Sequence, residues 1–486
     1  MKMSAETLAP NSIRFAGHFF HSPVGLITFF FLLSRIIYLV VFRVTFNADG
    51  TLGSYWQFID PELLKHDLWN SLYYLHFEPP LFNAFLGIVL KCFPIHYAFA
   101  FQLLYLLMGY AFSLTLYHLM LRMQVQRGIS LILTLIHTIH PATVLYENWL
   151  FYACPTPLFL CISALCLCRF LETKRYRDGV VLFGVMAFLV YLNNFYTPWW
   201  FLFCVGILIY CCKMDRRIVI RSAMVPLLLV IALLVKQEAL FGKIQISPQF
   251  MMGTLIIRVH IPPQIKESLA ESGELPAWCL DPFREISIFS PYLGRVPLTG
   301  IPVLDQEKRS TGAINFNHSG YLKQFDICMP SFLRTLWKYP QNYLDTFDYA
   351  ITRYFVPASD DYGYVHGPYY EGALKSFTEY VNLMLSGQFQ PDQVGWFLVI
   401  GFPLLTIAGC IMAYLAYRHK SFTQWISLVY ILFNIFYATL IIILITAIEQ
   451  NRYRLAVDSY YLVLLGMCLT ALRARLTMPR MLRSST

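Results

Sequence analysis

The chain has 486 residues, of which 57% are hydrophobic and only 13% are charged, and its formal net charge is +9. About a quarter of the residues of a soluble domain are charged, so this composition, with a mean hydropathy of +0.53, excludes an ordinary soluble domain. The positive charge falls mostly in short clusters between apolar runs, which indicates cytoplasmic loops of a membrane protein rather than nucleic-acid binding.

Apolar runs long enough to cross a bilayer recur along most of the chain. The first one lacks the cleavage pattern of a signal peptide, so we expect it to be retained as a helix. The pattern predicts an all-α polytopic membrane protein with about ten transmembrane helices. The expected spans are 24–44, 97–121, 128–145, 151–170, 179–194, 196–212, 218–241, 394–417, 422–447 and 453–472.

The basic clusters set the predicted sidedness of these spans. They lie at 122–127, 169–177, 213–221, 418–420 and 473–483, and the alternation of ten spans puts all of them on one side. Positive charge favours the cytoplasmic side, so both chain ends are expected to be cytoplasmic. The outer segments are then 46–96, 146–150, 242–393 and 448–452.

Three domains follow from this topology. Residues 1–241 form an N-terminal transmembrane catalytic module with the outer loop 46–96, residues 242–393 form a mixed outer domain, periplasmic or lumenal, and residues 394–486 form C-terminal transmembrane helices. Cys279 and Cys328 lie in the outer domain and could pair in an oxidising compartment.

The apolar stretch Pro79–Phe93 is predicted not to span. It has fifteen residues, which is too short for a hydrocarbon core of about 30 Å. If it crossed, Arg122 and Arg127 would move to the outer side and the charge alternation would break. We therefore expect a re-entrant or interfacial helix on the outer face.

Acids gather in the first outer loop. Asp60-Pro61-Glu62 opens a helix, where Asp is a favoured N-cap and Pro a favoured first residue. Such a carboxylate, held at the membrane edge, either only caps the helix or also serves as a positioned base. His76 and Glu78 come just before the interfacial helix. As metal ligands, two residues at this spacing are a weak signal, so no cofactor is certain and a divalent metal stays open.

Further candidates lie at the other outer turns. Glu147 ends the third span beside aromatic residues, either as a solvated interfacial acid or as a second site residue. Asn451-Arg452-Tyr453-Arg454 puts two arginines on the outer side, against the charge trend, where they could bind a lipid phosphate or pair with Glu449. Arg35, in the middle of the first span, should pair with an acid or a carbonyl.

The order and sidedness of these motifs resemble the GT-C superfamily of polytopic glycosyltransferases, which includes the protein O-mannosyltransferases and the lipid A aminoarabinose transferases. In these enzymes an acid opens the first outer loop and a proline motif starts a non-spanning helix, and Asp60-Pro61-Glu62 and Glu78-Pro79-Pro80 are similar. Glu147 resembles their second acid, and Asn451-Arg452-Tyr453-Arg454 their late arginine motif.

The resemblance covers roughly residues 24–215 and the last outer turn. The superfamily often has Asp-Glu where this chain has Asp-Pro-Glu, and Lys-Pro where it has Glu-Pro-Pro. Its second acid commonly directly precedes a span, whereas Glu147 lies a few residues earlier. These departures make the second acid a weaker match than the first.

The resemblance implies an integral-membrane glycosyltransferase that moves a sugar from a polyprenyl-phosphate donor to an acceptor hydroxyl on the outer or lumenal face. Such a reaction needs a carboxylate base for the acceptor and positive charge for the departing phosphate. We expect Asp60 to be the base, with inversion at the anomeric carbon. Glu62 and Glu147 are further catalytic candidates, and the expected substrate-binding residues are His76, Glu78, Asn451, Arg452 and Arg454.

The expected partners are the lipid-linked donor, membrane lipid and a glycan, lipid or protein acceptor, with no nucleic acid. The membrane would be the plasma (inner) membrane in a bacterium or the endoplasmic reticulum in a eukaryote. The alternative function is a multi-pass transporter or lipid flippase, which about ten spans and Arg35 would also suit. The acids gathered at one face and the absence of matching halves favour the enzyme.

Overall fold

The computed structural model describes residues 22–212, 215–259, 261–360, 372–446 and 449–477. Within these residues the fold is helical, with one isolated bridge between Lys308 and Ile314. The chain ends, Lys213, Arg480 and Arg483 lie outside them. Seven described helices are long and apolar enough to cross a membrane, or eight if one bent pair counts as a single span. The protein is thus an α-helical polytopic membrane protein, and the count of about ten spans stays a prediction.

The long bundle contains eleven described helices, or ten segments when the bent pair is counted as one, all close to the expected spans. They are α2 (Pro23–Val40), α7 (Tyr97–Arg122), the bent pair α8 (Arg127–Ile139) and α9 (Pro141–Glu147), α10 (Pro155–Thr173), α11 (Tyr176–Leu192), α12 (Pro198–Cys211), α13 (Arg216–Phe241), α22 (Trp396–Arg418), α23 (Phe422–Leu444) and α24 (Gln450–Thr477). The two halves of the bent pair meet at 55° because Pro141 starts a new helix after His140. With 17 and 14 residues, α11 and α12 are shorter than a full span.

The remaining helices are short. In the first outer loop they are α3 (Ala48–Ser54), α4 (Pro61–His66), α5 (Leu68–Tyr73) and α6 (Pro80–Cys92). In the segment between α13 and α22 they are α14 (Pro248–Arg258), α15 (Pro263–Glu271), η1 (Ala277–Leu280), α16 (Ile286–Leu293), α17 (Pro302–Asp305), α18 (Gly320–Lys338), α19 (Pro340–Leu344), α20 (Thr346–Tyr354), η2 (Ala358–Asp360) and α21 (Ala373–Ser386).

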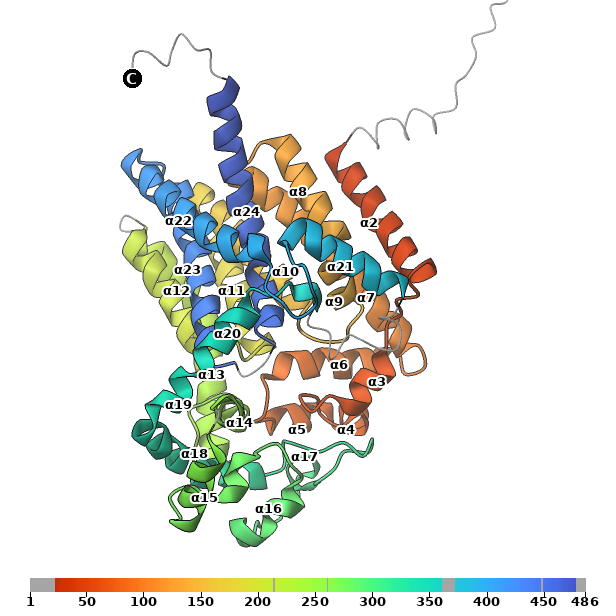
Figure 1. The fold of residues 1–486 in the computed structure, drawn as a ribbon, viewed down its shortest axis with the longest axis vertical. Coiled ribbons are helices and arrows are strands. Elements are labelled where there is room, and N and C mark those ends of the chain that lie inside the picture. The colour runs from red at the N-terminus through yellow and green to blue at the C-terminus, as the bar shows by residue number, and fades with distance from the viewer. Residues whose placement is uncertain (1–21, 213–214, 260, 361–371, 447–448, 478–486) are drawn as a thin grey trace, which may run out of the picture.

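The bundle has two distinct ends (Figure 1). The described start of α2 and the end of α24 lie at one end, whereas α14 to α19 lie at the other. We refer to these as the basic end and the outer end, because the predicted basic loops belong to the first. Helix α6 lies crosswise to the long helices near the outer end (Figure 1), and it packs on α4, α7 and α11. This is the arrangement that the sequence predicts for an interfacial helix.

The outer segment has its own small cores. Cys279 and Cys328 form a disulfide, with Cα atoms 5.5 Å apart, in a buried cluster that includes Met252, Ile256 and Phe332. The bond suits an oxidising compartment outside the cytoplasm. Its pairing was expected from the sequence only if this segment faced such a compartment.

The last part of this segment returns to the bundle. Helix α20 packs on α23 and α24, and α21 packs on α22. The Phe377 ring of α21 also stacks on Phe42, with centroids 5.2 Å apart. Apolar side chains that lie beside long apolar helices bury surface there. The part of 242–393 that stands clear of the bundle therefore ends near α19.

A labelling experiment tests this topology. Leu298→Cys, at an exposed position beyond α16, should react with a membrane-impermeant maleimide added to sealed cells or vesicles of known orientation. Arg175→Cys, exposed between α10 and α11, should react only after the membrane is opened. The exposed native Cys92 and Cys410 are first changed to Ser to remove background. Labelling of both positions from the same side would contradict the topology.

Candidate functional site

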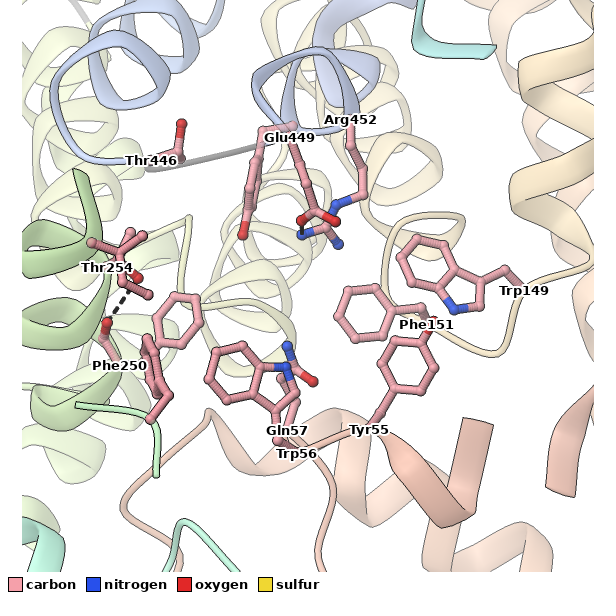
Figure 2. A pocket seen from close by; sticks show the side chains of 13 residues that line it. Tyr55, Trp56, Gln57, Trp149, Phe151, Phe250, Thr254, Thr446, Glu449 and Arg452 are labelled. Atoms are coloured by element: carbon pink, nitrogen blue, oxygen red, sulfur yellow. Dashed lines mark hydrogen bonds and ion pairs between the residues drawn. The ribbon is translucent and has the colours of Figure 1, made fainter. Parts of the chain in front are cut away.

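An aromatic cavity lies where the first outer loop meets the ends of the bundle helices (Figure 2). Its volume is about 70 Å³, room for a small polar group or one end of a larger ligand. The lining residues come from the segment before α4, the turn between α9 and α10, helix α14, the turn between η1 and α16, and the region from the end of α23 to the start of α24. They are Tyr55, Trp56, Gln57, Trp149, Phe151, Phe250, Thr254, Ile257, Phe283, Thr446, Glu449, Arg452 and Tyr453.

Arg452 is the cation of this aromatic cavity. Its guanidinium pairs with the Glu449 carboxylate one turn earlier. It also lies over three rings, 5.4 Å from the centroid of Trp149, 5.2 Å from Phe151 and 4.6 Å from Tyr453. Figure 2 shows Arg452 and Glu449 side by side, pointing away from α24 into the cavity. Cation–π contacts of this kind partly replace lost hydration of a buried charge.

One nitrogen of this guanidinium is left without a partner. The buried Nε of Arg452 has no hydrogen-bond partner within the described ranges. An arginine presents five N–H donors in a planar fork, so the pairing with Glu449 leaves donors for a second anion. The sequence offered Glu449 as an alternative to a lipid phosphate as the partner of Arg452. The ion pair confirms that Arg452 and Glu449 interact.

Glu78 lies close to Arg452 on the side of the first outer loop. Its side chain is 4% exposed, and the Asn194 amide nitrogen lies 3.4 Å from its Oε1 atom. Burial raises the pKa of the Glu78 carboxyl well above its ordinary value, and the nearby Arg452 charge opposes that shift. Tyr152 is buried near both residues, and burial raises the pKa of its hydroxyl while the Glu78 charge adds to the effect.

Three outer segments therefore converge on one buried acid–base cluster. Glu78 precedes α6, Tyr152 lies in the turn before α10, and Arg452 opens α24. A buried carboxyl with a raised pKa next to a desolvated cation is typical of functional sites. The cluster can exchange a proton at Glu78 and bind an anion at Arg452, while the aromatic walls exclude water.

The structure places Asp60 elsewhere. Asp60 caps α4 by accepting a hydrogen bond from the Glu62 N–H, at 3.0 Å. It also accepts bonds from the backbone N–H and the hydroxyl of Ser310, at 2.6 and 2.5 Å. Neither Asp60 nor Glu78 lines the aromatic cavity, but Glu78 lies close enough to Arg452 for that charge to act on its carboxyl. The observed contacts are those of a cap that also fastens the outer segment to the first loop.

Two other candidates from this loop, Glu62 and His76, also have partners within the protein. Glu62 is exposed and pairs with Lys65 at 2.8 Å, a contact that lowers the Glu62 pKa. His76 is fully buried, with Nε2 2.9 Å from the Asn317 carbonyl oxygen. Burial lowers the pKa of His76 to about 3, so its ring is neutral at pH 7. His76 therefore bridges the loop to the outer segment.

Glu147 forms a buried ion pair with Arg35. Two guanidinium nitrogens donate to the two carboxylate oxygens, at 3.0 and 2.6 Å, and Arg35 also donates to the Thr138 carbonyl at 2.6 Å. The expectation that Arg35 pairs with an acid or a carbonyl is confirmed on both counts. A Cβ atom at Gly109 would collide with the Glu147 carboxylate, so a glycine there makes room for the pair.

Arg454 and Asn451 hold the chain after α20. Arg454 donates from Nη1 to the carbonyls of Tyr354 and Val356, the latter at 3.0 Å, and its Nε lies 3.0 Å from Asp458. Asn451 donates to the Pro357 carbonyl at 3.1 Å. Of the two arginines predicted to bind phosphate, only Arg452 lines the aromatic cavity.

Among the described residues, no three His, Cys, Asp or Glu side chains gather into a group that could hold a metal ion. His76 and Glu78 lie in one segment, yet their partners are Asn317 and Asn194. Tyr55, Trp56, Phe151 and Tyr152 are among the site residues that the sequence did not single out, as are the lining residues from α14 and its neighbours. For Phe151 and Tyr152, the available signal was the aromatic run that starts at Trp149, where the predicted outer turn 146–150 meets the expected span 151–170.

Comparison of the chain with known protein families, with curated proteins and with solved structures finds no match.

The Arg35–Glu147 pair predicts a stability effect. Glu147→Gln would leave Arg35 as an uncompensated buried charge, which costs about 3–5 kcal/mol, so the purified protein should unfold at a clearly lower temperature. Replacing both residues, in Arg35→Met with Glu147→Leu, should recover much of that loss. If Glu147→Gln instead keeps wild-type thermal stability in detergent, the pair is not what stabilises this part of the bundle.

Proposed function

We propose that this protein is an integral-membrane transferase that moves a sugar from a polyprenyl-phosphate donor to an acceptor hydroxyl at the outer end of the bundle. The observation that carries the proposal is the convergence of Glu78 and Arg452 beside an aromatic cavity. Their motifs, Glu78-Pro79-Pro80 and Asn451-Arg452, are two of those that resemble the GT-C glycosyltransferases. The geometry supports a reaction that needs one acid, one phosphate-binding cation and apolar walls.

Each part of the cluster has a role in this scheme. Arg452 binds the phosphate of the donor through the donors that Glu449 leaves available, and it stabilises the charge that develops as the phosphate departs. The rings of Trp56, Trp149 and Phe151 line the cavity, with Trp149 and Phe151 stacked on each other at 4.5 Å between centroids, and they form an apolar wall beside the phosphate. The surrounding apolar helices accommodate the lipid tail.

Glu78 is the proposed base. It takes the proton of the acceptor hydroxyl while the acceptor oxygen bonds to the anomeric carbon. The bond between that carbon and the phosphate oxygen breaks, and the lipid phosphate leaves with its electron pair. One displacement of this kind inverts the anomeric configuration. Asp60, the base favoured by the sequence, is the rival, and the two acids are separated by the experiment below.

Two isosteric variants identify the base. Glu78→Gln should fold, bind donor and lose at least about a hundredfold in turnover, the low end of general-base contributions. Asp60→Asn caps a helix about as well as Asp, so it should fold and keep turnover within a few-fold of wild type. The assay is sugar transfer from a lipid-phosphate donor in detergent, where no second compartment exists. If Asp60→Asn loses turnover and Glu78→Gln keeps it, Asp60 is the base.

If neither purified wild-type protein nor the variants transfer sugar, the test turns to transport. Uptake or lipid flipping by reconstituted vesicles, without transfer in detergent, would favour the alternative of a transporter or flippase. Arg35→Met with Glu147→Leu provides the matched variant there, because a transport path through the buried pair would need its charges.

Arg452 should also control the pH dependence. Glu78 can accept a proton only when ionised, so activity rises with pH through the Glu78 pKa, which burial raises above its ordinary value. The Arg452 charge lowers that pKa, and Arg452→Gln should therefore move the acid limb of kcat/KM to higher pH and weaken donor binding. Lys338→Gln, an exposed change on α18, should leave the limb in place. If the acid limb of kcat/KM does not move in Arg452→Gln, the Glu78 pKa does not set the pH dependence of activity.

A further inference from the structure

A second cleft lies at the opposite end of the bundle and takes no part in the proposed reaction. It has a volume of about 820 Å³ and is formed where α10 and α12 end, α13 and α23 begin and α22 turns into α23. In Figure 1 the ends of α12 and α22 lie on the same side of the bundle, far from α14 to α19. The lining residues are Leu171, Lys174, Tyr210, Cys211, Asp215, Tyr414, Ala416, Tyr417, Lys420, Phe422, Thr423 and Trp425.

The charge in this cleft is positive. Lys174 and Lys420 line it with one acid, Asp215, so two positive charges and one negative leave a net +1. The Lys174 ammonium lies 2.9 Å from the Asp215 carboxylate. Both ammonium groups are on exposed residues, and they retain donors for a further anion because each ammonium has three.

Both lysines occupy unusual backbone positions. Lys174, which ends α10, has φ of 52°, and Lys420, in the turn between α22 and α23, has φ of 57°. Glycine adopts this left-handed conformation at no steric cost and is the usual residue there. Lysine at both turns directs two cations toward one cleft despite that backbone preference. Five other described non-glycine residues also have positive φ, so the feature specific to this place is that both turns carry a cation lining one cleft.

Aromatic rings form the rest of the wall. Tyr414 and Tyr417 project from the last turns of α22 and are more than half exposed. The Trp425 ring lies 5.2 Å from Tyr417 and 6.0 Å from Phe422, centroid to centroid. Rings of this kind gather at the level of lipid headgroups, where one edge is apolar and the other is wet. Below them, α12 and α22 expose Phe203 and Ile411 toward the surrounding lipid.

We propose that this cleft binds an anionic membrane phospholipid in the leaflet at the basic end. The lipid phosphate lies between the ammonium groups of Lys174 and Lys420, the aromatic rings contact the glycerol region, and the acyl chains follow α12 and α22. Basic pockets between transmembrane helices recognise anionic headgroups in this way. The site is separate from the cavity of Arg452 and does not depend on the proposed transferase activity.

Fluorescence quenching tests the site, because Trp425 lies within it. The full chain in detergent is titrated with phosphatidylglycerol that carries bromine on its acyl chains. Quenching of one tryptophan component is expected, and Trp425→Phe should remove that component. The same titration with brominated phosphatidylcholine should quench much more weakly. Equal quenching by the two lipids, or quenching unaffected by Trp425→Phe, would overturn the proposal.

Charge variants show whether the two lysines are responsible. Lys174→Gln with Lys420→Gln should weaken phosphatidylglycerol binding about tenfold or more, since each lysine near a lipid surface contributes several-fold. The matched control, Arg177→Gln with Arg473→Gln, removes two charges at the same end outside the cleft and should bind as the wild type does. An equal loss in both double variants would mean general surface attraction and would overturn the specific site.

Two further outcomes are decisive. If inorganic phosphate at millimolar concentration displaces the brominated lipid, the cleft binds free phosphate and the lipid assignment is wrong. If Lys174→Gln lowers the thermal stability through loss of the Asp215 contact, the single variant Lys420→Gln is used. It should still weaken phosphatidylglycerol binding, and unchanged binding would overturn the site. Lys420 forms no ion pair within the described residues, so its replacement should leave the fold intact.

Discussion

The structure depends on the pairing of charges that cannot remain unpaired in an apolar surrounding. Removing a charge from water costs several kcal/mol unless an opposite charge or several hydrogen bonds replace hydration. Arg35 and Glu147 satisfy each other inside the bundle, and Arg454 satisfies its charge with two carbonyls and Asp458. These pairs fix where α2, α9, α20 and α24 meet.

Two incompletely paired charged groups lie close together beside the outer end. The Nε atom of Arg452 is buried without a partner in the described part of the chain, and Glu78 is buried with one long contact to Asn194. Other buried arginines, Arg258 and Arg309, also have nitrogens without a hydrogen-bond partner in the described residues, so the distinguishing feature here is that a buried acid and a buried cation lie close together. The aromatic walls strengthen the case, since they exclude water from the same place.

The connection between the outer segment and the membrane bundle has a clear physical basis. The Asp60 carboxylate accepts a hydrogen bond from the Ser310 hydroxyl, and the His76 ring contacts the Asn317 carbonyl. The Phe77 ring stacks on Phe316, with centroids 5.3 Å apart. Each contact joins the first outer loop to the segment after α13. Asp60 and His76 of this loop thus hold the outer segment in place. Glu78, from the same loop, instead lies near Arg452.

The sequence by itself determined the helical membrane class, the approximate position of each long helix, the crosswise helix after Pro79 and the partner type of Arg35. These follow from apolar length, proline position and the cost of a buried charge, which are local properties. Only the tertiary structure decided which acid meets which arginine. Asp60, Glu78 and Glu147 are each an acid in a predicted outer segment, and the sequence does not say which residue each one contacts. Packing turns the first to Ser310, the second toward Arg452 and the third to Arg35.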